Sequence, residues 1–366
     1  MKTIAVLVLF LSFYIPQVDA FWGDDKKEEK NVKAPVKKLN REDLLQDEKN
    51  TISIYKQNVN SVVNVTNIQH ARSWAFGNVE EIPRGTGSGY VWSKDGHIVT
   101  NYHVVAGGHA FVVNFKGDKK QYSAEVVGIE ARKDIAVLKL KEMPKKLNPI
   151  DLGSSKNLQV GQKVLAIGNP FGLDHSISKG IVSATGRVMD GVAGLKIHDM
   201  IQTDAAINRG NSGGPLLDSS GSLIGMNTQI ISPSGGSSGL GFAVPVDTIA
   251  RIVPQLIQYG EVIRPGLGLN PLREDIKLRF FGKGGVVIQS IDERGAAYKA
   301  GLRGMSSDGR GRYRLGDIIL EVNGIKVNDK DGLVHELDKY KVGEKVELKY
   351  LRNEKQKKVR VTLKKI

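Results

Sequence analysis

The most informative stretch of the sequence is Gly210-Asn211-Ser212-Gly213-Gly214-Pro215. A serine hydroxyl is a weak nucleophile at neutral pH, so it needs a base within reach and hydrogen-bond donors for the oxyanion that its attack creates. Glycines beside the serine let the backbone turn tightly. We therefore expect the N–H groups of Gly210 and Ser212 to form an oxyanion hole. Because such a turn can also be only a turn, Ser212 needs partners elsewhere in the chain.

Two upstream residues have the sequence settings that these partners require. His103 follows an apolar run that begins at Val99, which predicts a ring at a strand end, packed but near the surface. Asp134 directly precedes the apolar segment 135–140, where it could fix the histidine tautomer and stabilise the imidazolium. Taken singly, His103 could be structural and Asp134 a turn residue. With Ser212 they follow the His, Asp, Ser order of chymotrypsin-type proteases, unlike subtilisins or α/β-hydrolases.

Composition favours short strands and turns. The chain has 366 residues, including 42 glycines, with 40% apolar and 6% aromatic residues, and its length fits two domains. Short β-rich runs separated by glycine turns extend from about residue 59 to 245, with a hairpin turn expected at residues 94–97. This pattern predicts antiparallel barrels or a sandwich. A helix is expected from Pro245 to Tyr259, capped by Asp247, and Pro254 could kink or shorten it.

The beginning of the sequence predicts export. An apolar run at residues 4–15 has the length of a signal-peptide core and is short for a membrane span, and residues 18–20 provide a cleavage site with small side chains. We expect a signal peptide at residues 1–20, with an uncleaved anchor as the alternative, and a charged linker at residues 21–40. An amphipathic helix is expected within residues 41–58, and its apolar candidates are Leu44, Leu45, Ile52 and Tyr55.

Charge and the absence of cysteine narrow the class of protein. Without cysteine the chain has no disulfide, no cysteine nucleophile and no thiolate metal site, so export fits a bacterial periplasm better than an animal secretory route. The formal net charge is +14, with many lysines near the two ends and no interleaved aromatics for base stacking. We interpret this charge as a solvated surface and expect no nucleic-acid partner, with polyanion binding as the alternative. No phosphate loop or ligand cluster is recognisable, so we expect no metal and no cofactor.

The three candidate catalytic residues lie in segments that resemble the HtrA/Deg (high-temperature requirement) family of trypsin-like serine proteases. The resemblance covers almost all of the sequence after residue 20 and is closest to members with one PDZ domain. It is carried by Thr100-Asn101-Tyr102-His103-Val104-Val105, Asp134-Ile135-Ala136-Val137-Leu138, Gly168-Asn169-Pro170-Phe171-Gly172-Leu173, Gln202-Thr203-Asp204-Ala205-Ala206-Ile207-Asn208, Gly210–Pro215 and Gly241-Phe242-Ala243-Val244-Pro245. One departure is Arg209, where the family commonly has proline; this change could make the oxyanion loop more mobile at rest.

The resemblance implies a mostly β fold. A chymotrypsin-like pair of six-stranded antiparallel β-barrels is expected at residues 41–260, with the triad in the cleft between them, and an α+β PDZ domain at residues 264–366. It also implies an ATP-independent serine endopeptidase for stress response and protein quality control, which degrades unfolded or misfolded exported proteins in the periplasm. A homotrimer or larger homo-oligomer is implied as well. The alternative function is a holdase chaperone or peptide sensor, which the protease activity need not exclude.

Part of the specificity can be predicted. Trypsin-like enzymes that cleave after Lys or Arg use an Asp six residues before the serine; here that position is Ala206, which predicts cleavage after small or medium aliphatic residues. The segment from Asn227 resembles the family's strand that pairs with the substrate backbone. The predicted substrate-binding residues are Ala206, Asn227, Thr228, Gln229 and Ile230.

The last hundred residues resemble a PDZ domain of the family's circularly permuted kind. Residues 265–269 would form the carboxylate-binding loop for a peptide C-terminus, while a sheet edge takes the peptide as an added strand. A plain β-rich accessory domain is the alternative. The predicted peptide-binding residues are Gly266, Leu267, Gly268, Leu269, Leu333, Val334 and Leu337. Expected strands lie near residues 284–290, 317–322, 345–351 and 358–364, and expected helices near 295–301 and 330–339.

Overall fold

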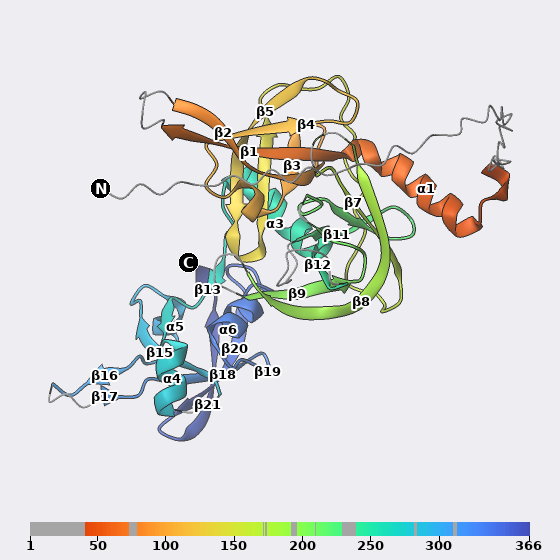
Figure 1. Cartoon of the computed structure of the whole chain (residues 1–366). Coiled ribbons are helices and arrows are strands. Elements are labelled where there is room, and N and C mark those ends of the chain that lie inside the picture. Colours follow the sequence, from red (N-terminus) through yellow and green to blue (C-terminus); the bar gives the residue numbers. More distant parts are fainter. Residues whose placement is uncertain are drawn as a thin grey trace, which may run out of the picture. The chain divides into compact units, whose positions relative to one another are not determined.

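The computed structural model describes most of the chain after residue 40 (Figure 1). The described residues are 41–72, 79–170, 172, 174–191, 196–208, 210–228, 239–281, 284–309 and 313–366. The expected signal peptide and linker lie outside them, as do Arg209, Gln229 and Ile230. The chain separates into two units, residues 1–44 and 45–366, and the second contains every α-helix and strand described below. None of the helices in these described ranges is long and apolar enough to cross a membrane.

Six antiparallel strands close a first barrel, in the order β1-β2-β3-β6-β5-β4. Inside it, buried side chains such as Val63, Val65 and Val113 alternate with outward-facing ones, as the two-residue period of a strand requires. The expected turn at residues 94–97 joins β2 to β3. The strands are β1 (Val62–Arg72), β2 (Val79–Val91), β3 (His97–Thr100), β4 (Ala110–Asn114), β5 (Gln121–Glu130) and β6 (Ile135–Leu140).

Six further antiparallel strands close a second barrel, in the order β10-β11-β12-β9-β8-β7. The strands are β7 (Lys163–Gly168), β8 (Ser176–Asp190), β9 (Lys196–Thr203), β10 (Pro215–Leu217), β11 (Leu223–Asn227) and β12 (Gly241–Pro245). The predicted pair of six-stranded barrels is therefore confirmed. The composition and strand pattern were also compatible with a β-sandwich, and the closure of both sheets into barrels excludes that alternative.

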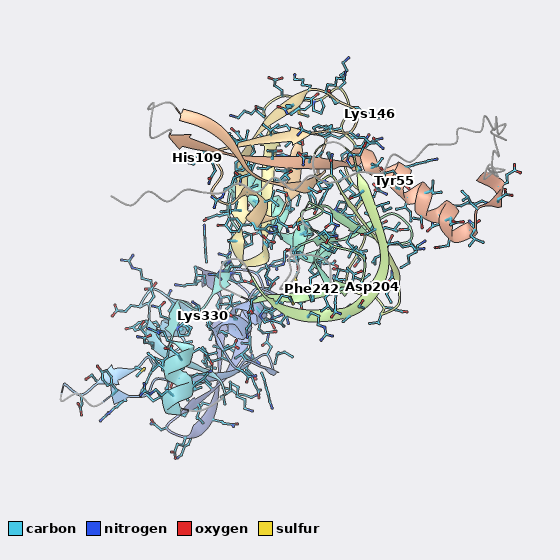
Figure 2. The ribbon with its side chains drawn as sticks, in the orientation of Figure 1. Tyr55, His109, Lys146, Asp204, Phe242 and Lys330 are labelled. Carbon is cyan, nitrogen blue, oxygen red and sulfur yellow. The ribbon has the colours of Figure 1, made fainter. Side chains whose placement is uncertain are left out.

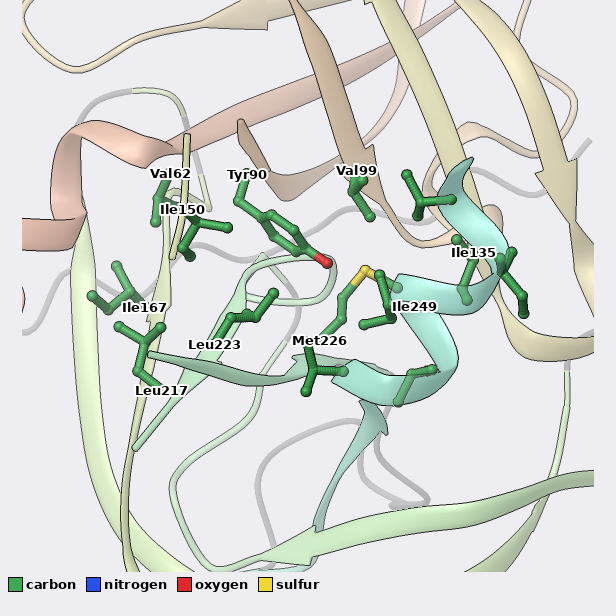
Figure 3. Packing of buried hydrophobic residues seen from close by; sticks show 14 of the residues in the cluster. Val62, Tyr90, Val99, Ile135, Ile150, Ile167, Leu217, Leu223, Met226 and Ile249 are labelled. Atoms are coloured by element: carbon green, nitrogen blue, oxygen red, sulfur yellow. The ribbon is translucent and has the colours of Figure 1, made fainter. Parts of the chain in front are cut away.

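One apolar core joins the two barrels and the helix that follows them, α3 (Val246–Tyr259). Figure 3 shows the ring of Tyr90 lying among side chains from both barrels and Ile249 of α3. Helix α3 continues past Pro254, so the proline does not shorten it. The expected cap at Asp247 is wrong, because the helix already begins at Val246 after Pro245. The Asp247 carboxylate instead accepts hydrogen bonds from the loop at Ser155, at 2.6 Å from its N and from its Oγ.

The expected N-terminal helix is present as α1 (Gln46–Asn58), preceded by a 3-10 turn, η1 (Arg41–Asp43). Its apolar face agrees with the prediction only in part: Tyr55, labelled in Figure 2, packs against the core, but Ile54 is buried beside it, and Leu45 and Ile52 are exposed. The face that is buried depends on where the helix meets the second barrel. That contact includes Asp47, whose carboxylate accepts hydrogen bonds from the ammonium groups of two lysines of that barrel, Lys163 at 2.8 Å and Lys179 at 2.9 Å.

The C-terminal region is a six-stranded sheet with helices. Its edge strand β14 (Leu269–Pro271) begins the order β14-β15-β18-β20-β21, and the sixth strand, β19, pairs only with β18. The helix α4 (Glu274–Phe281) has no counterpart in the sequence prediction; four of its eight residues are charged and four are apolar. The other elements are β13 (Pro265–Gly266), β15 (Val286–Ile291), α5 (Ala296–Lys299), β16 (Ser306–Ser307), β17 (Tyr313–Arg314), β18 (Ile318–Val322), β19 (Ile325–Lys326), α6 (Lys330–Leu337), β20 (Lys345–Arg352), β21 (Lys355–Thr362) and β22 (Lys364–Lys365).

Candidate active site

The imidazole of His103 is held by the carboxylate of Asp134. His103 Nδ1 lies 2.8 Å from Asp134 Oδ2, and the His103 backbone N–H donates to Oδ1 at 3.0 Å. The expected strand-end position is nearly correct: β3 ends at Thr100, and His103 lies in the single helical turn that follows, α2 (Tyr102–Val105). Because the carboxylate accepts a hydrogen bond from Nδ1–H, the proton of the neutral ring stays on Nδ1 and Nε2 is free to act as a base.

Asp134 reaches this position through an unusual backbone conformation. Its φ is 55°, in the left-handed region, where a short 3-10 turn at residues 131–133 ends and β6 begins. Asp is among the few residues that tolerate this region. The side chain is 1% exposed, and Asn101 Nδ2 donates to the Asp134 carbonyl oxygen at 3.0 Å. Asp134 is thus a turn residue at a strand start and also the residue that orients His103.

Thr228 completes the surroundings of this carboxylate. Its hydroxyl donates to Asp134 Oδ2 at 2.7 Å, and its backbone N–H donates to the carbonyl oxygen of Phe242 at 3.0 Å. The sequence prediction placed Thr228 in the substrate-binding segment. In the structure its side chain contacts the Asp134 carboxylate, across 94 residues of sequence, and its contact with substrate stays a prediction. No local pattern around Thr228 indicates that contact.

Ser212 lies in a loop where two glycines could not be replaced by residues with a side chain. Gly210 and Gly213 have φ values of 110° and 84°, which residues with a side chain rarely adopt. A Cβ on Gly213 would lie 2.1 Å from the carbonyl oxygen of Ser88, and one on Gly210 would lie 2.2 Å from Cβ of Pro170. The serine is held between strands because its carbonyl oxygen accepts the Ser88 N–H at 2.8 Å. The glycines of the motif therefore allow the close approach of β2 to the serine loop.

Ser88 is a further contact of the loop that carries Ser212, and it was not among the residues predicted for the site. It is fully buried, and its Oγ donates to the carbonyl oxygen of Gly210 at 2.5 Å while accepting the N–H of Asn169 at 2.8 Å. Asn211 adds two contacts, accepting the N–H of Asn208 and donating to the carbonyl oxygen of Ala206, both at 3.0 Å. The only signal in the sequence is a serine between two glycines on β2.

A cavity of about 590 Å³ is lined by His103 and by Ser212. Within the described part of the chain, no hydrogen bond joins His103 and Ser212, and hydrogen bonds between catalytic residues often tighten only when substrate binds. The lining residues are Asn67, Arg84, Gly85, Thr86, His103, Val104, Ala106, Pro170, Gly210 and Ser212.

The other predicted substrate-binding residues do not line this cavity. Ala206 is exposed, and its carbonyl oxygen also accepts the hydroxyl of Ser178 at 2.9 Å. Asn227 is fully buried and donates from Nδ2 to the carbonyl oxygen of Pro215 at 3.0 Å. Their contact with substrate stays a prediction, and Gln229 and Ile230 are not among the described residues.

A second cavity, of about 530 Å³, lies between the edge strand β14 and helix α6. The structure brings all seven predicted peptide-binding residues to its lining: Gly266, Leu267, Gly268, Leu269, Leu333, Val334 and Leu337. The loop is anchored because the carbonyl oxygens of Leu267 and Gly268 accept the N–H groups of Ala297 and Asp292, at 2.7 and 3.0 Å. The groove therefore combines an unpaired strand edge with an apolar helix face, the arrangement that accepts a peptide as an added strand.

The fold and the site together define a trypsin-like serine protease followed by a PDZ domain. The family model of the trypsin-like peptidase domain matches residues 87–226, and that of the PDZ domain matches residues 265–363. A chloroplastic relative from Arabidopsis thaliana, Protease Do-like 1, is 49% identical over 321 residues, which are 87% of this chain and 73% of that protein. The chain belongs to the HtrA/Deg family of serine endoproteases.

Other relatives extend the comparison. The probable periplasmic serine endoprotease DegP-like of Brucella suis is 41% identical over 287 residues; these are 77% of this chain and only 53% of that protein. Among solved structures, the HtrA-type protease AlgW with a decapeptide has a TM-score of 0.67 at 30% identity, covering 86% of this chain and 98% of AlgW. Deg5 has a TM-score of 0.51 at 39% identity, covering 60% of this chain and 99% of Deg5.

Proposed function

We propose that the chain hydrolyses unfolded or misfolded exported proteins through an acyl-enzyme, without ATP. The observation that carries this proposal is the His103–Asp134 hydrogen bond, because it holds an imidazole that lines the same cavity as Ser212. His103 Nε2 takes the proton of Ser212 as Oγ bonds to the scissile carbonyl carbon. The N–H groups of Gly210 and Ser212 stabilise the resulting oxyanion.

The same groups act in the breakdown of the tetrahedral intermediate, where His103 serves as the acid. The imidazolium of His103 gives its proton to the leaving amine, and the C–N bond breaks to leave the acyl group on Ser212 Oγ. A water molecule then loses its proton to His103 and attacks the acyl carbon, which releases the acid and restores the hydroxyl. Asp134 stays ionised throughout and stabilises the imidazolium, with Thr228 holding the carboxylate in place.

The preference for unfolded substrates follows from the way an extended peptide is bound. A segment that pairs with the enzyme through its backbone must offer free N–H and C=O groups, and in folded proteins nearly all of these are already paired. Ala206 provides no charge for a Lys or Arg side chain, so burial of such a residue before the scissile bond would be unfavourable. We expect cleavage after small or medium aliphatic residues.

The PDZ groove would recruit substrates or regulators by their C-termini. Its loop at residues 266–269 would bind the terminal carboxylate, and β14 would pair with the peptide backbone. The solved AlgW relative was described with a decapeptide, in keeping with such a role. The signal-like N-terminus and the periplasmic DegP-like relatives support a periplasmic location, although the Arabidopsis relatives are chloroplastic. A homotrimer or larger assembly is part of the proposal and can be checked by native mass measurement.

Labelling with a serine-specific acylating reagent tests the mechanism. Wild-type protein should be labelled and should digest a denatured protein, and Ser212→Ala should lose both properties. Sequencing the new N-termini of the products reports the residue before each cut. Labelling that persists in Ser212→Ala would overturn the assignment of the nucleophile. Suppression of client aggregation at full strength by the same variant would favour a holdase function.

A further inference from the structure

The residues that line the Ser212 cavity indicate which side of the scissile bond would occupy it. The cavity is lined by His103, which protonates the leaving amine, and by Gly210 of the oxyanion loop. None of the described residues predicted to bind the acyl part of the substrate, Ala206, Asn227 and Thr228, lines it. The space is therefore positioned for the residues that follow the scissile bond, on the leaving-group side.

Arg84 is the one permanently charged side chain among the described residues that line this cavity. It lies in β2, where the pairing with β1 passes from Gly85 opposite Asn67 directly to Pro83 opposite Ile68. Arg84 is thus the extra residue of a β-bulge. Bulges are common at the rims of barrels beside active sites, where they redirect a side chain.

The guanidinium of Arg84 lies beside the loop that follows the His103 turn. A Cβ built on Gly107 would be 2.7 Å from Arg84 Nη1, so the guanidinium occupies the space that a side chain there would need. Gly107 has a φ of 66°, and its carbonyl oxygen accepts the side-chain amide of Gln69 at 2.7 Å. The bulge and this fixed loop together place a cation at the rim of the leaving-group side.

We propose that Arg84 forms a carboxylate-binding subsite for the part of the substrate that leaves first. This inference rests on the proposed protease mechanism and adds a substrate preference to it. A guanidinium presents donors in a planar fork that matches a carboxylate. The carboxylate would come from an Asp or Glu side chain after the scissile bond, or from the C-terminus of a short leaving peptide.

The position of Arg84 along β2 indicates which substrate residue the subsite would bind. Ser88 of β2 bonds to the Ser212 carbonyl oxygen, and Arg84 lies four residues earlier on the same strand, about 13 Å away at the usual strand rise. An extended substrate advances by the same rise per residue. Allowing for the length of both side chains, the subsite is level with roughly the second or third residue after the scissile bond.

A matched set of peptides tests the proposal. All are acetylated and amidated, share one acyl side with an aliphatic residue before the scissile bond, and differ only in having Glu, Gln or Lys two or three residues after it. The full-length wild type should cleave the Glu peptide with a kcat/KM about three- to fivefold above the Gln peptide, as for a partly exposed ion pair, and less so at high salt. Arg84→Gln should cleave the two equally, and Arg84→Glu should prefer Lys.

Controls separate the subsite from general damage and from the protease mechanism. Arg187→Gln removes an exposed arginine of β8, which bonds to Gln202 Oε1 at 2.9 Å, and should keep the wild-type preference. Peptides with a free C-terminal carboxylate at the same position form a further comparison. If only these peptides show an Arg84-dependent rise in kcat/KM, then the subsite binds a chain end and not an acidic side chain. Product N-termini from a denatured protein should also be enriched in Asp and Glu at these positions for wild type and not for Arg84→Gln.

Two results would overturn the subsite: wild type that treats the Glu and Gln peptides and the terminal carboxylate alike, or an acid preference that persists in Arg84→Gln. Failure of the proposed function looks different, because then no peptide or denatured protein is cleaved in a manner that depends on Ser212.

Discussion

Replacing Thr228 by valine would remove one hydrogen bond from the Asp134 carboxylate and keep the shape of the side chain. That carboxylate accepts three contacts: the Thr228 hydroxyl at 2.7 Å, His103 Nδ1 at 2.8 Å and the His103 N–H at 3.0 Å. Since Asp134 is 1% exposed, little water can replace the lost donor. A hydrogen bond to a charged group contributes about 1.5–3 kcal/mol.

The expected effect on catalysis follows from this free energy. If the whole contribution is lost in the transition state, where the imidazolium of His103 relies on a fixed carboxylate, kcat/KM falls about 10- to 100-fold. The assay is cleavage of a fluorogenic peptide, with the rate of acylation by a serine-specific reagent as a second readout. Thr228→Ser keeps the hydroxyl and should retain most of the activity.

A small effect would refute this reasoning. Thr228→Val could fold with the wild-type thermal midpoint and keep kcat/KM within about twofold of wild type. Such a change is well below the tenfold that corresponds to about 1.4 kcal/mol, and it would mean that the hydroxyl does not help to orient the carboxylate. A loss that Thr228→Ser shares in full would instead indicate that the packing of the methyl group matters.

Three further changes probe other parts of the molecule. Ser88→Ala removes the buried hydroxyl under the oxyanion loop and should lower kcat about tenfold with little change in KM, whereas an equal rise in KM would point to substrate binding. Val334→Glu places a charge in the half-buried groove wall and should abolish binding of C-terminal peptides in a fluorescence-polarisation assay, while Val342→Glu, at an exposed site, should bind normally. Hydrogen bonds from its two lysine partners lower the pKa of Asp47 from 3.8 to about 2, so its stabilising effect is complete above pH 3.8 and is lost as the pH falls through about 2. Asp47→Asn should therefore lower the thermal midpoint at neutral pH, and its deficit relative to wild type should disappear near pH 2; a deficit that is constant with pH would contradict the assignment.

Several local features could be predicted because neighbouring residues determine them. Glycines at positive φ, a turn between two strands and an apolar run each depend on steric limits within a few residues. The segments around the proposed catalytic residues His103, Asp134 and Ser212 are of this kind, and so is the loop at residues 265–269. Where a prediction was wrong, contacts between residues far apart in the sequence decided the outcome. The buried face of α1, for example, is selected by the barrel that the helix contacts and not by the helix's own pattern.

The sequence by itself determined which residues we propose to be reactive, their chain order and the two-residue period of the strands. Only the tertiary structure decided which side chains meet around these residues: Thr228 on the Asp134 carboxylate, Ser88 under the Gly210 carbonyl and Arg84 at a bulge on the rim. These contacts join residues 94 and 122 positions apart, or depend on a one-residue change of register. Because a slip of one residue turns every side chain of a strand to the opposite face, only closure of the barrels in one register could select them.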